Sequence, residues 1–421
     1  MIRTHVFACS LLRSEADALN RESGRVYTNT LVRHYRIKRK TGHWLSPRAG
    51  ERVEDSTGPS TLHAHSRDAA QQGFYRACKT ARTLQEQGDP DVRYPYRRKR
   101  WRTTIWKNTA IPPSAARPAS CAWHGAGARP PVTVVLPAHL AALPARCFVK
   151  MRLVWDRVAC QYTWHLVVDD GITPAPTMAT GVVGVDLGEI HPAALTGGTE
   201  ATIITCRALR SCVQYTNKRL AALRSKQGGH ERGSRRWKRL QRRKTQFLAR
   251  QKRRARDLAH KASRAVVDRA QEHAVGTLAI GDVRHVADGK RLRRSEQHKI
   301  SQWGHGKLRR YIGYKAEAAG ITVVDTVIEA YTSQTCPRCG HRSKPKGRIF
   351  VCHVCGFQCA RDTVGAANIL SRHLYGEVGR VPPPAHTKYR HPAWQGKRSR
   401  LDTAHVARTG GLDTSREDQA L

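Results

Sequence analysis

Short apolar runs follow one another in a regular order through the second half of the chain. Those at 182–187, 193–196 and 201–206 have the length of strands, and the first has the composition of a buried one. Between 207 and 274 the apolar residues recur close to every three or four positions, which predicts helix. Gly228 and Gly229 interrupt this region, so we expect a hairpin of two helices.

Two further strands are expected at 277–283 and 321–329, on either side of a helix at 300–319. A last helix begins near Asp362, which we expect to be its N-cap. The resulting order is three strands, helix, strand, helix, strand, insert, helix. This is the order of an RNase H-like α/β fold, in which the first three strands are antiparallel and right-handed crossovers lead to two more.

The first half of the chain is less regular. Residues 1–50 contain short strand-like pieces, 62–84 a helix, and 111–131 a Pro- and Ala-rich linker or loop. Strand-like runs return at 132–136, 147–155 and 160–168. We therefore expect a β-rich domain over 1–180 with a helical insert at about 55–110. Beyond Gly376 little can be buried, so 377–421 is expected to be a disordered basic tail.

The net charge of the chain indicates which class of molecule it binds. The chain carries 75 Lys and Arg against 32 Asp and Glu, a formal net charge of +43, so we expect a polyanion with many phosphates. The basic residues are spread along the chain rather than set beside an apolar anchor, and no apolar run reaches the roughly 18 residues of a membrane span. A soluble intracellular protein is expected, with no membrane partner.

Two segments concentrate this charge. Residues 232–256 contain thirteen Lys and Arg and no acid, which favours a phosphate-lined groove over a solvated helix face of mixed sign. Residues 93–108 interleave bases with aromatics, which suits stacking on unpaired bases, although Trp101 and Trp106 are equally well explained as anchors of a small core. The candidate nucleic-acid-binding residues are Arg97, Arg98, Lys99, Arg100, Trp101, Arg235, Arg236, Lys238, Arg239, Arg242 and Arg243.

Four cysteines have the spacing of a metal site. Cys336 and Cys339 form one Cys-x-x-Cys knuckle, and Cys352 and Cys355 form a second. Two such knuckles predict a structural zinc ion held by four thiolates, with no open position for catalysis. A redox dithiol pair is the alternative, but the βαβ context of such a motif is missing.

Acidic residues at the ends of apolar runs are candidates for catalysis. Asp186 ends the strand at 182–187 and is either an ordinary turn residue or a rigid ligand for Mg²⁺. Asp362 is either a helix cap alone or a second ligand. Glu329 ends the strand next to that of Gly281 and Asp282; since adjacent strands lie about 4.8 Å apart, Glu329 can reach the site over the space above Gly281. A solvated strand end is the alternative for both Glu329 and Asp282. It explains Asp282 as well as a role does, so Glu329 is placed ahead of Asp282 as a metal ligand.

Several of these motifs occur together in one family. The order Gly184-Val-Asp-Leu-Gly, a basic hairpin, Ile280-Gly-Asp-Val, Gln302-Trp-Gly-His-Gly, Tyr331-Thr-Ser-Gln-Thr-Cys, Cys352-x-x-Cys-Gly, Arg361-Asp and Ala366-Ala-Asn-Ile resembles the TnpB family. These are transposon-encoded proteins, long described as accessory transposases, that are related to type V CRISPR effector nucleases. The resemblance is close over 181–375 and looser before it.

The resemblance implies an RNA-guided DNA endonuclease with a RuvC-like site. A guide RNA from the transposon end would select double-stranded target DNA beside a short motif, and the protein is expected to act as a monomer. Asp186 and Asp362 match the family's first and third acidic residues. Most relatives carry Glu at the position of Gly281, and the chain resembles a rearranged subset with Glu at the position of Glu329.

The resemblance also implies a mechanism and a division into domains. Asp186, Glu329 and Asp362 would hold two Mg²⁺, one activating water and one stabilising the leaving 3′ oxygen. Residues 1–180 would be the wedge with its recognition insert, 181–335 and 359–376 the RuvC-like domain, and 336–358 the zinc ribbon. Two other functions fit the same residues: an RNA-guided DNA-binding repressor with a dead site, and a transposase acting on the element's own ends.

Overall fold

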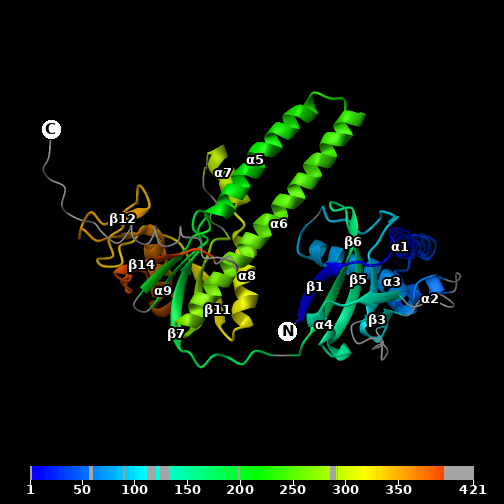
Figure 1. Ribbon diagram of the computed structural model, residues 1–421, viewed down its shortest axis with the longest axis horizontal. Coiled ribbons are helices and arrows are strands. Elements are labelled where there is room, and N and C mark those ends of the chain that lie inside the picture. Colours follow the sequence, from blue (N-terminus) through cyan, green and yellow to red (C-terminus); the bar gives the residue numbers. More distant parts are fainter. Residues whose placement is uncertain are drawn as a thin grey trace. The chain divides into compact units, whose positions relative to one another are not determined.

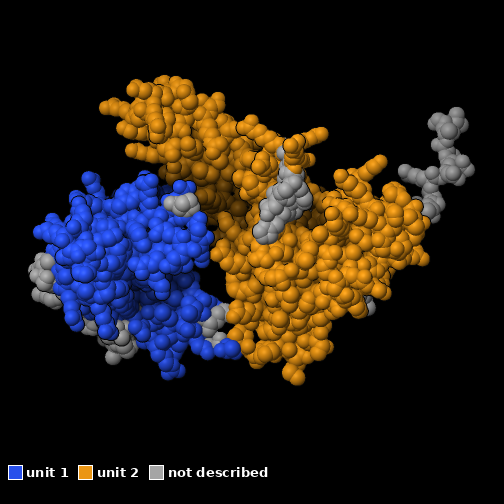
Figure 2. Space-filling model, turned by 180° about the vertical axis from the view of Figure 1, so that it is seen from behind, with its two compact units in different colours: residues 1–173 blue, residues 174–421 orange. Residues whose placement is uncertain are grey.

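The structure, a computed structural model, forms two compact units, Met1–Thr173 and Pro174–Leu421, which Figure 2 shows in different colours. It describes residues 2–55, 60–89, 91–110, 120–123, 132–171, 173–197, 200–284, 291 and 293–392. Of the loop expected at 111–131, only Ser120–Trp123 is described, and it is a strand, β3, paired with β4 (Val132–Val135). No described helix is long and apolar enough to cross a bilayer.

The first unit is built on a four-stranded antiparallel sheet. Its strand order is β1 (Ile2–Ala8), β6 (Gln161–Asp169), β5 (Phe148–Asp156) and β2 (Thr104–Lys107). The ring of Trp106 is buried and packs edge-on against Trp164, with centroids 5.7 Å apart. Trp106 is therefore a core residue, whereas Trp101 is exposed. Short segments complete this unit: α4 (Ala138–Ala141) and the 3₁₀ turns Asn108–Ala110 and Ala145–Cys147.

Three helices lie between β1 and β2 in the chain: α1 (Arg13–Thr41), α2 (Pro47–Asp55) and α3 (Ala64–Glu86). The expected helix at 62–84 is observed, but the strands expected within 1–50 are wrong beyond β1, and the helical insert begins at residue 13 rather than 55. The reason lies in α1, whose buried face includes Asn20, Ser23 and Thr30 besides its apolar residues. Such a face has no clear apolar period in the sequence.

The second unit contains a six-stranded sheet with the order β11-β10-β7-β8-β9-β14 (Figure 1). Strands β7 (Gly181–Asp186), β8 (Ala193–Thr196) and β9 (Glu200–Ile204) are antiparallel neighbours. Strands β10 (Val275–Asp282) and β11 (Thr322–Ile328) continue the sheet on the other side of β7, each parallel to its neighbour. These are the strands and directions expected from the sequence.

The sixth strand corrects the expected tail. β14 (His386–Arg390) pairs in parallel with β9, so part of the expected tail belongs to the sheet, and 393–421 lie outside the described residues. Its side chains are mostly polar, and two of them form ion pairs: Lys388 with Glu200 and Arg390 with Glu272. Main-chain hydrogen bonds and surface ion pairs hold this strand in the sheet. It therefore lacks the run of apolar residues by which a strand is predicted from sequence. It also covers the edge that β9 would otherwise expose.

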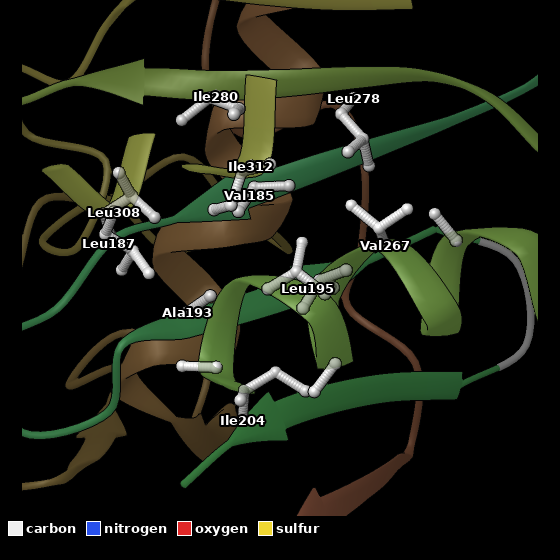
Figure 3. Packing of buried hydrophobic residues seen from close by; sticks show 14 of the residues in the cluster. Val185, Leu187, Ala193, Leu195, Ile204, Val267, Leu278, Ile280, Leu308 and Ile312 are labelled. Carbon is white, nitrogen blue, oxygen red and sulfur yellow. The ribbon is translucent and has the colours of Figure 1, made fainter. Parts of the chain in front are cut away.

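Helices cover both faces of the sheet. Figure 3 shows one face, where Val185, Leu187 and Ile280 of the sheet region pack with Leu308 and Ile312. The last two belong to α8 (His305–Glu317), and α6 (Arg235–Glu272) contributes Val267. On the other face lies α9 (Arg361–Tyr375), whose Ala366 and Ile369 contact sheet residues.

The expected helical hairpin is also present. α5 (Arg207–Gly228) and α6 extend together away from the sheet (Figure 1), and the first buried residue of α6 is Leu258, more than twenty residues into the helix. Gln227 joins them by donating to Gln241 and accepting from Lys244, both at 3.0 Å. A short helix, α7 (Arg294–Gln302), precedes α8. The hairpin therefore presents a long, strongly basic surface.

Candidate active site and cysteine cluster

Asp186 is the last residue of the central strand β7 and lies against the first turns of α9. Two glycines make this approach close. A Cβ on Gly184 would lie 2.2 Å from the carbonyl oxygen of Ala366, and one on Gly365 would lie 2.4 Å from Oδ2 of Asp186. Glycine inside a helix is unusual and often marks such close packing, so Gly365 is a sequence signal for the approach of α9 to Asp186.

Glu329 follows β11 directly and reaches over β10. A Cβ on Gly281 would lie 2.0 Å from Oε1 of Glu329 and 2.5 Å from its Cγ, so the glutamate fills the space that the glycine leaves. The backbone of Gly281 does not have a positive φ and does not itself require glycine. The glycine is therefore explained by the side chain lying over it.

Asp362 is the second residue of α9, and Ala360 rather than Asp362 is the N-cap. The expected cap is wrong because the N-cap lies two residues earlier. The carboxylate instead pairs with Nη1 of Arg348, at 3.2 and 3.3 Å from its two oxygens, and its side chain is 19% exposed. Arg348 belongs to the cysteine-rich insert, so this ion pair joins the insert to the helix of the candidate site.

Asp186 interacts electrostatically with both of the other carboxyl groups. Burial raises the pKa of Asp186, and the charge of Asp362 raises it further. Burial likewise raises the pKa of Glu329, with Asp186 the next contributor. Oε1 of Glu329 is buried and has no hydrogen-bond partner in the described parts of the chain. An unpaired buried carboxylate oxygen beside a second carboxylate is the arrangement that a divalent cation would neutralise.

The carboxylates of Asp186, Glu329 and Asp362 are nevertheless farther apart than the thiols of the cysteine cluster. Among the described residues, only the four cysteines place three or more metal-ligand atoms within 4.8 Å of one another. Asp362 turns toward Arg348, and Asp186 and Glu329 repel each other. The structure thus brings the three predicted residues to one end of the sheet, and their catalytic role stays a prediction.

Asp282 has other partners. Nη2 of Arg284 lies 2.5 Å from one of its oxygens and Arg309 lies 3.7 Å from the other. The hydrogen bonds from Arg284 lower the pKa of Asp282 to about 2. Of the two interpretations left open for this residue, the arrangement favours a structural ion pair at the strand end.

Two residues of α9 hold the turn that carries Glu329, and sequence analysis missed both roles. Nη1 of Arg372 donates to the carbonyls of Ile328 at 2.6 Å and Ala330 at 3.1 Å, on either side of the glutamate. Asn368 is fully buried and donates to the carbonyls of Thr332 and Thr335. These bonds span more than thirty residues of sequence, and no local pattern signals them.

Strand β14 adds a residue on the Asp362 side. The ring of Tyr389 lies 6.0 Å from that of His191, and the charge of Asp362 affects the pKa of both after the larger effect of burial. Nδ1 of His191 is buried without a partner within the described residues. The segment expected to be a tail therefore contributes to the surroundings of the site.

The four predicted zinc ligands form one cluster. Sγ of Cys336 lies 3.6 Å from that of Cys355, and Sγ of Cys339 lies 3.5 Å from that of Cys352. Each knuckle is closed by a glycine with positive φ, whose N–H donates to the first cysteine's carbonyl: Gly340 and Gly356. Strands β12 (Ile349–Val351) and β13 (Gln358–Ala360) pair beside it. This donor set fits a tetrahedral structural zinc ion.

The predicted nucleic-acid-binding residues lie on two surfaces. One set is on the hairpin, where all six side chains are exposed on the first turns of α6: Arg235, Arg236, Lys238, Arg239, Arg242 and Arg243. The other set, Arg97 to Trp101, lies in the first unit between α3 and β2, also exposed. There the backbone of Arg100 passes 2.7 Å from where a Cβ of Gly24 would be, and Arg21 lies over the ring of Trp101.

Comparison with known proteins agrees with this picture. Residues 165–287 match the OrfB_IS605 family, described as a probable transposase, and 305–369 match the TNB domain of Cas12f1-like proteins. Among curated proteins, the chain is 34% identical over 114 residues to the CRISPR-associated endodeoxyribonuclease Cas12f1 of Sulfoacidibacillus thermotolerans, covering 26% of this chain and 25% of that protein.

Two more relatives come from other organisms. The chain is 29% identical over 129 residues to a TnpB-like protein of Methanocaldococcus jannaschii, covering 30% of this chain and 45% of that one. It is 29% identical over 214 residues to the putative RNA-guided DNA endonuclease InsQ of Escherichia coli K12, covering 47% and 50%. The chain thus spans a quarter to a half of the length of these curated relatives.

The solved structures show the fold. A Cas12f1 complex with single-guide RNA and target DNA aligns with a TM-score of 0.58 at 13% identity, covering 85% of this chain and 83% of that one. The chain thus has a mixed α/β fold similar to that of this Cas12f1 protein. The two family matches and the curated relatives show that parts of the chain are similar to proteins of the TnpB family.

Proposed function

We propose that the protein is an RNA-guided DNA endonuclease with a RuvC-like, RNase H-like catalytic domain, encoded by a transposable element. The observation that carries the proposal is the placement of Glu329 over Gly281, beside Asp186 and near Asp362. Named relatives support the substrate, since one is called an endodeoxyribonuclease and another a putative RNA-guided DNA endonuclease.

Each residue has a distinct part in this proposal. Asp186 and Glu329 present carboxylates whose charge is costly to bury, so the site favours binding cations there, and Asp362 supplies a third carboxylate at its edge. Two Mg²⁺ ions held by such carboxylates supply an activated water and stabilise the leaving oxygen of a phosphodiester. Arg372 holds the carbonyls on both sides of Glu329 and so fixes that carboxylate over β10.

The remaining parts of the chain would bind the nucleic acids. The exposed cations of α6 suit the backbone of a guide RNA and its target, because phosphate contacts need charge rather than sequence readout. We assign residues 1–180 to the wedge with its helical insert and 336–358 to the zinc ribbon. A monomer carrying a guide RNA from the transposon end is the expected assembly.

The test uses the protein purified with the RNA that it retains. We expect this ribonucleoprotein to linearise a plasmid carrying a sequence matched to that RNA when Mg²⁺ is present, and to leave an unmatched plasmid supercoiled. Binding of the matched plasmid without cutting would support the repressor instead. Cutting that survives removal of the RNA by RNase would support a transposase that needs no guide.

The proposed cation site should affect how the thermal stability of the protein depends on pH. Because the pKa values of Asp186 and Glu329 are raised, these two groups bind more protons in the folded protein without cations than in the unfolded chain. Their contribution to stability therefore falls as pH rises above about 4. Asp186→Asn removes one charge and should raise the metal-free Tm at pH 8, by about 2–4 °C for each kcal/mol relieved. The gain should shrink at pH 5.

Scanning calorimetry with and without Mg²⁺ measures both effects. Added Mg²⁺ should raise the Tm of the wild type at pH 8 by neutralising the carboxylates, and should raise that of Asp186→Asn much less. Equal shifts in the two proteins would mean that the ion binds elsewhere.

A further inference from the structure

A cavity of about 1020 Å³ lies within the second unit, and the catalytic proposal does not use it. It opens to solvent on one side and is bordered by the α5–α6 hairpin, by α7 and α8, and by the loop that follows β7. Cations line it from several helices, among them Arg210, Lys218, Lys252, Arg256, Lys299 and Lys307. Apolar and aromatic side chains also line it, including Leu209, Val213, Trp303, Leu308 and Tyr311.

The charge of this cavity is one-sided. Among the described residues, Glu189 is the one acid that lines it, and its Oε1 lies 3.1 Å from Nε of Arg210. Lys218, Lys252, Arg256, Lys299 and Lys307 face no second acid of this lining, so they can attract an anion. A ligand that satisfies both linings must combine negative groups with flat apolar ones, which is the make-up of a nucleotide. In a duplex the bases are stacked inside, so the apolar lining suits unpaired nucleotides.

The position of the cavity indicates which nucleic-acid strand it would bind. Nε1 of Trp303 donates to the carbonyl of Gly188 at 3.1 Å, and Gly188 lies two residues beyond Asp186. The loop after β7 therefore begins at the candidate catalytic aspartate, and its next residues line the cavity. A strand lying in the cavity would be within a few nucleotides of that residue.

We propose that this cavity binds unpaired nucleotides of the DNA strand that is led to Asp186, with phosphates on its cations and bases on its apolar lining. The proposal deepens the function proposed above and rests on it for the identity of the strand. The volume is at the upper end of the range of small-molecule sites, about 300–1,000 Å³, which leaves room for a base with its sugar and phosphate.

Matched charge reversals test the phosphate part. Lys252→Glu with Lys307→Glu changes two cations that line the cavity, one on α6 and one on α8. Arg254→Glu with Arg310→Glu makes the same change on the same helices at exposed positions outside the lining. The affinity of the full chain, with its co-purified RNA, for a fluorescent twelve-nucleotide oligothymidine is measured by anisotropy at fixed salt and without divalent cations.

We expect the cavity pair to bind the oligonucleotide at least tenfold more weakly than the wild type, and the matched pair less than threefold more weakly. Equal losses in the two pairs would overturn the proposal, because they would show only a general loss of positive charge. Loss of the co-purified RNA from the cavity pair alone, with DNA affinity unchanged, would also overturn it and assign the cavity to RNA.

An abasic strand tests the base part. The wild type should bind a twelve-unit abasic deoxyribose-phosphate oligomer at least tenfold more weakly than oligothymidine, and the cavity pair should lose this preference. Equal binding of both probes by the wild type would overturn the proposal. Since none of these measurements needs cleavage, a protein that binds oligothymidine in this way but never cuts DNA would refute the proposed nuclease and leave the cavity assignment standing.

Discussion

Asp186→Ala is expected to abolish cleavage of a matched plasmid while leaving its binding intact. Asp186 is the carboxylate at the end of the central strand; it lies against Gly365 of α9, and its charge raises the pKa of Glu329. We expect a fall of about 1,000-fold or more, equal to about 4 kcal/mol of transition-state stabilisation. Initial rates of plasmid nicking and linearisation measure it, and electrophoretic mobility shift of the same plasmid fragment measures binding.

Folding is not expected to obscure this result. The substitution removes a carboxylate whose ionised form is costly to bury, so the variant should keep or raise the metal-free Tm. Binding should survive because the exposed cations of α6 are far along the helix from its buried part.

Asp282→Ala is the matched control. Asp282 lies on the neighbouring strand, but Arg284 and Arg309 already neutralise it, so its loss should change the cleavage rate less than about tenfold. Cleavage by Asp186→Ala at the wild-type rate would end the nuclease proposal. An equal loss in the two variants would instead move Asp282 into the site.

The parts of this molecule that could be predicted from sequence are those with a local pattern. The strand ending at Asp186, the basic hairpin and the paired Cys-x-x-Cys knuckles each occupy a short stretch, and the structure shows all three. The space above Gly281 could be anticipated as well, because adjacent strands have a fixed spacing.

The parts that could not be predicted depend on contacts between distant segments or on faces that are not apolar. α1 buries Asn20, Ser23 and Thr30, so the amphipathic period that marks most helices is weak there. β14 is held by main-chain pairing with β9 and by ion pairs at its surface. The bonds from Arg372 and Asn368 to the turn around Glu329 link residues more than thirty positions apart.

Moving the glutamate back to β10 is expected to restore cleavage that its loss from β11 removes. Glu329→Ala should lower the rate about 1,000-fold, as for Asp186. Gly281→Ala should also impair cleavage, since its Cβ would lie 2.0 Å from Oε1 of Glu329 and would displace that carboxylate. In Gly281→Glu with Glu329→Ala, the new side chain enters the space that the old one vacates.

Recovery in the double variant would follow from the geometry of the sheet. Gly281 pairs with Val327 on β11, next to the strand end that carries Glu329, and its backbone accepts a side chain without strain. We expect at least tenfold faster plasmid cleavage than for Glu329→Ala alone. Gly281→Ala with Glu329→Ala adds the Cβ but no carboxylate and should show no recovery. If both double variants cleave equally slowly, the carboxylate over Gly281 is not what the reaction needs, and the third acidic group must be sought elsewhere.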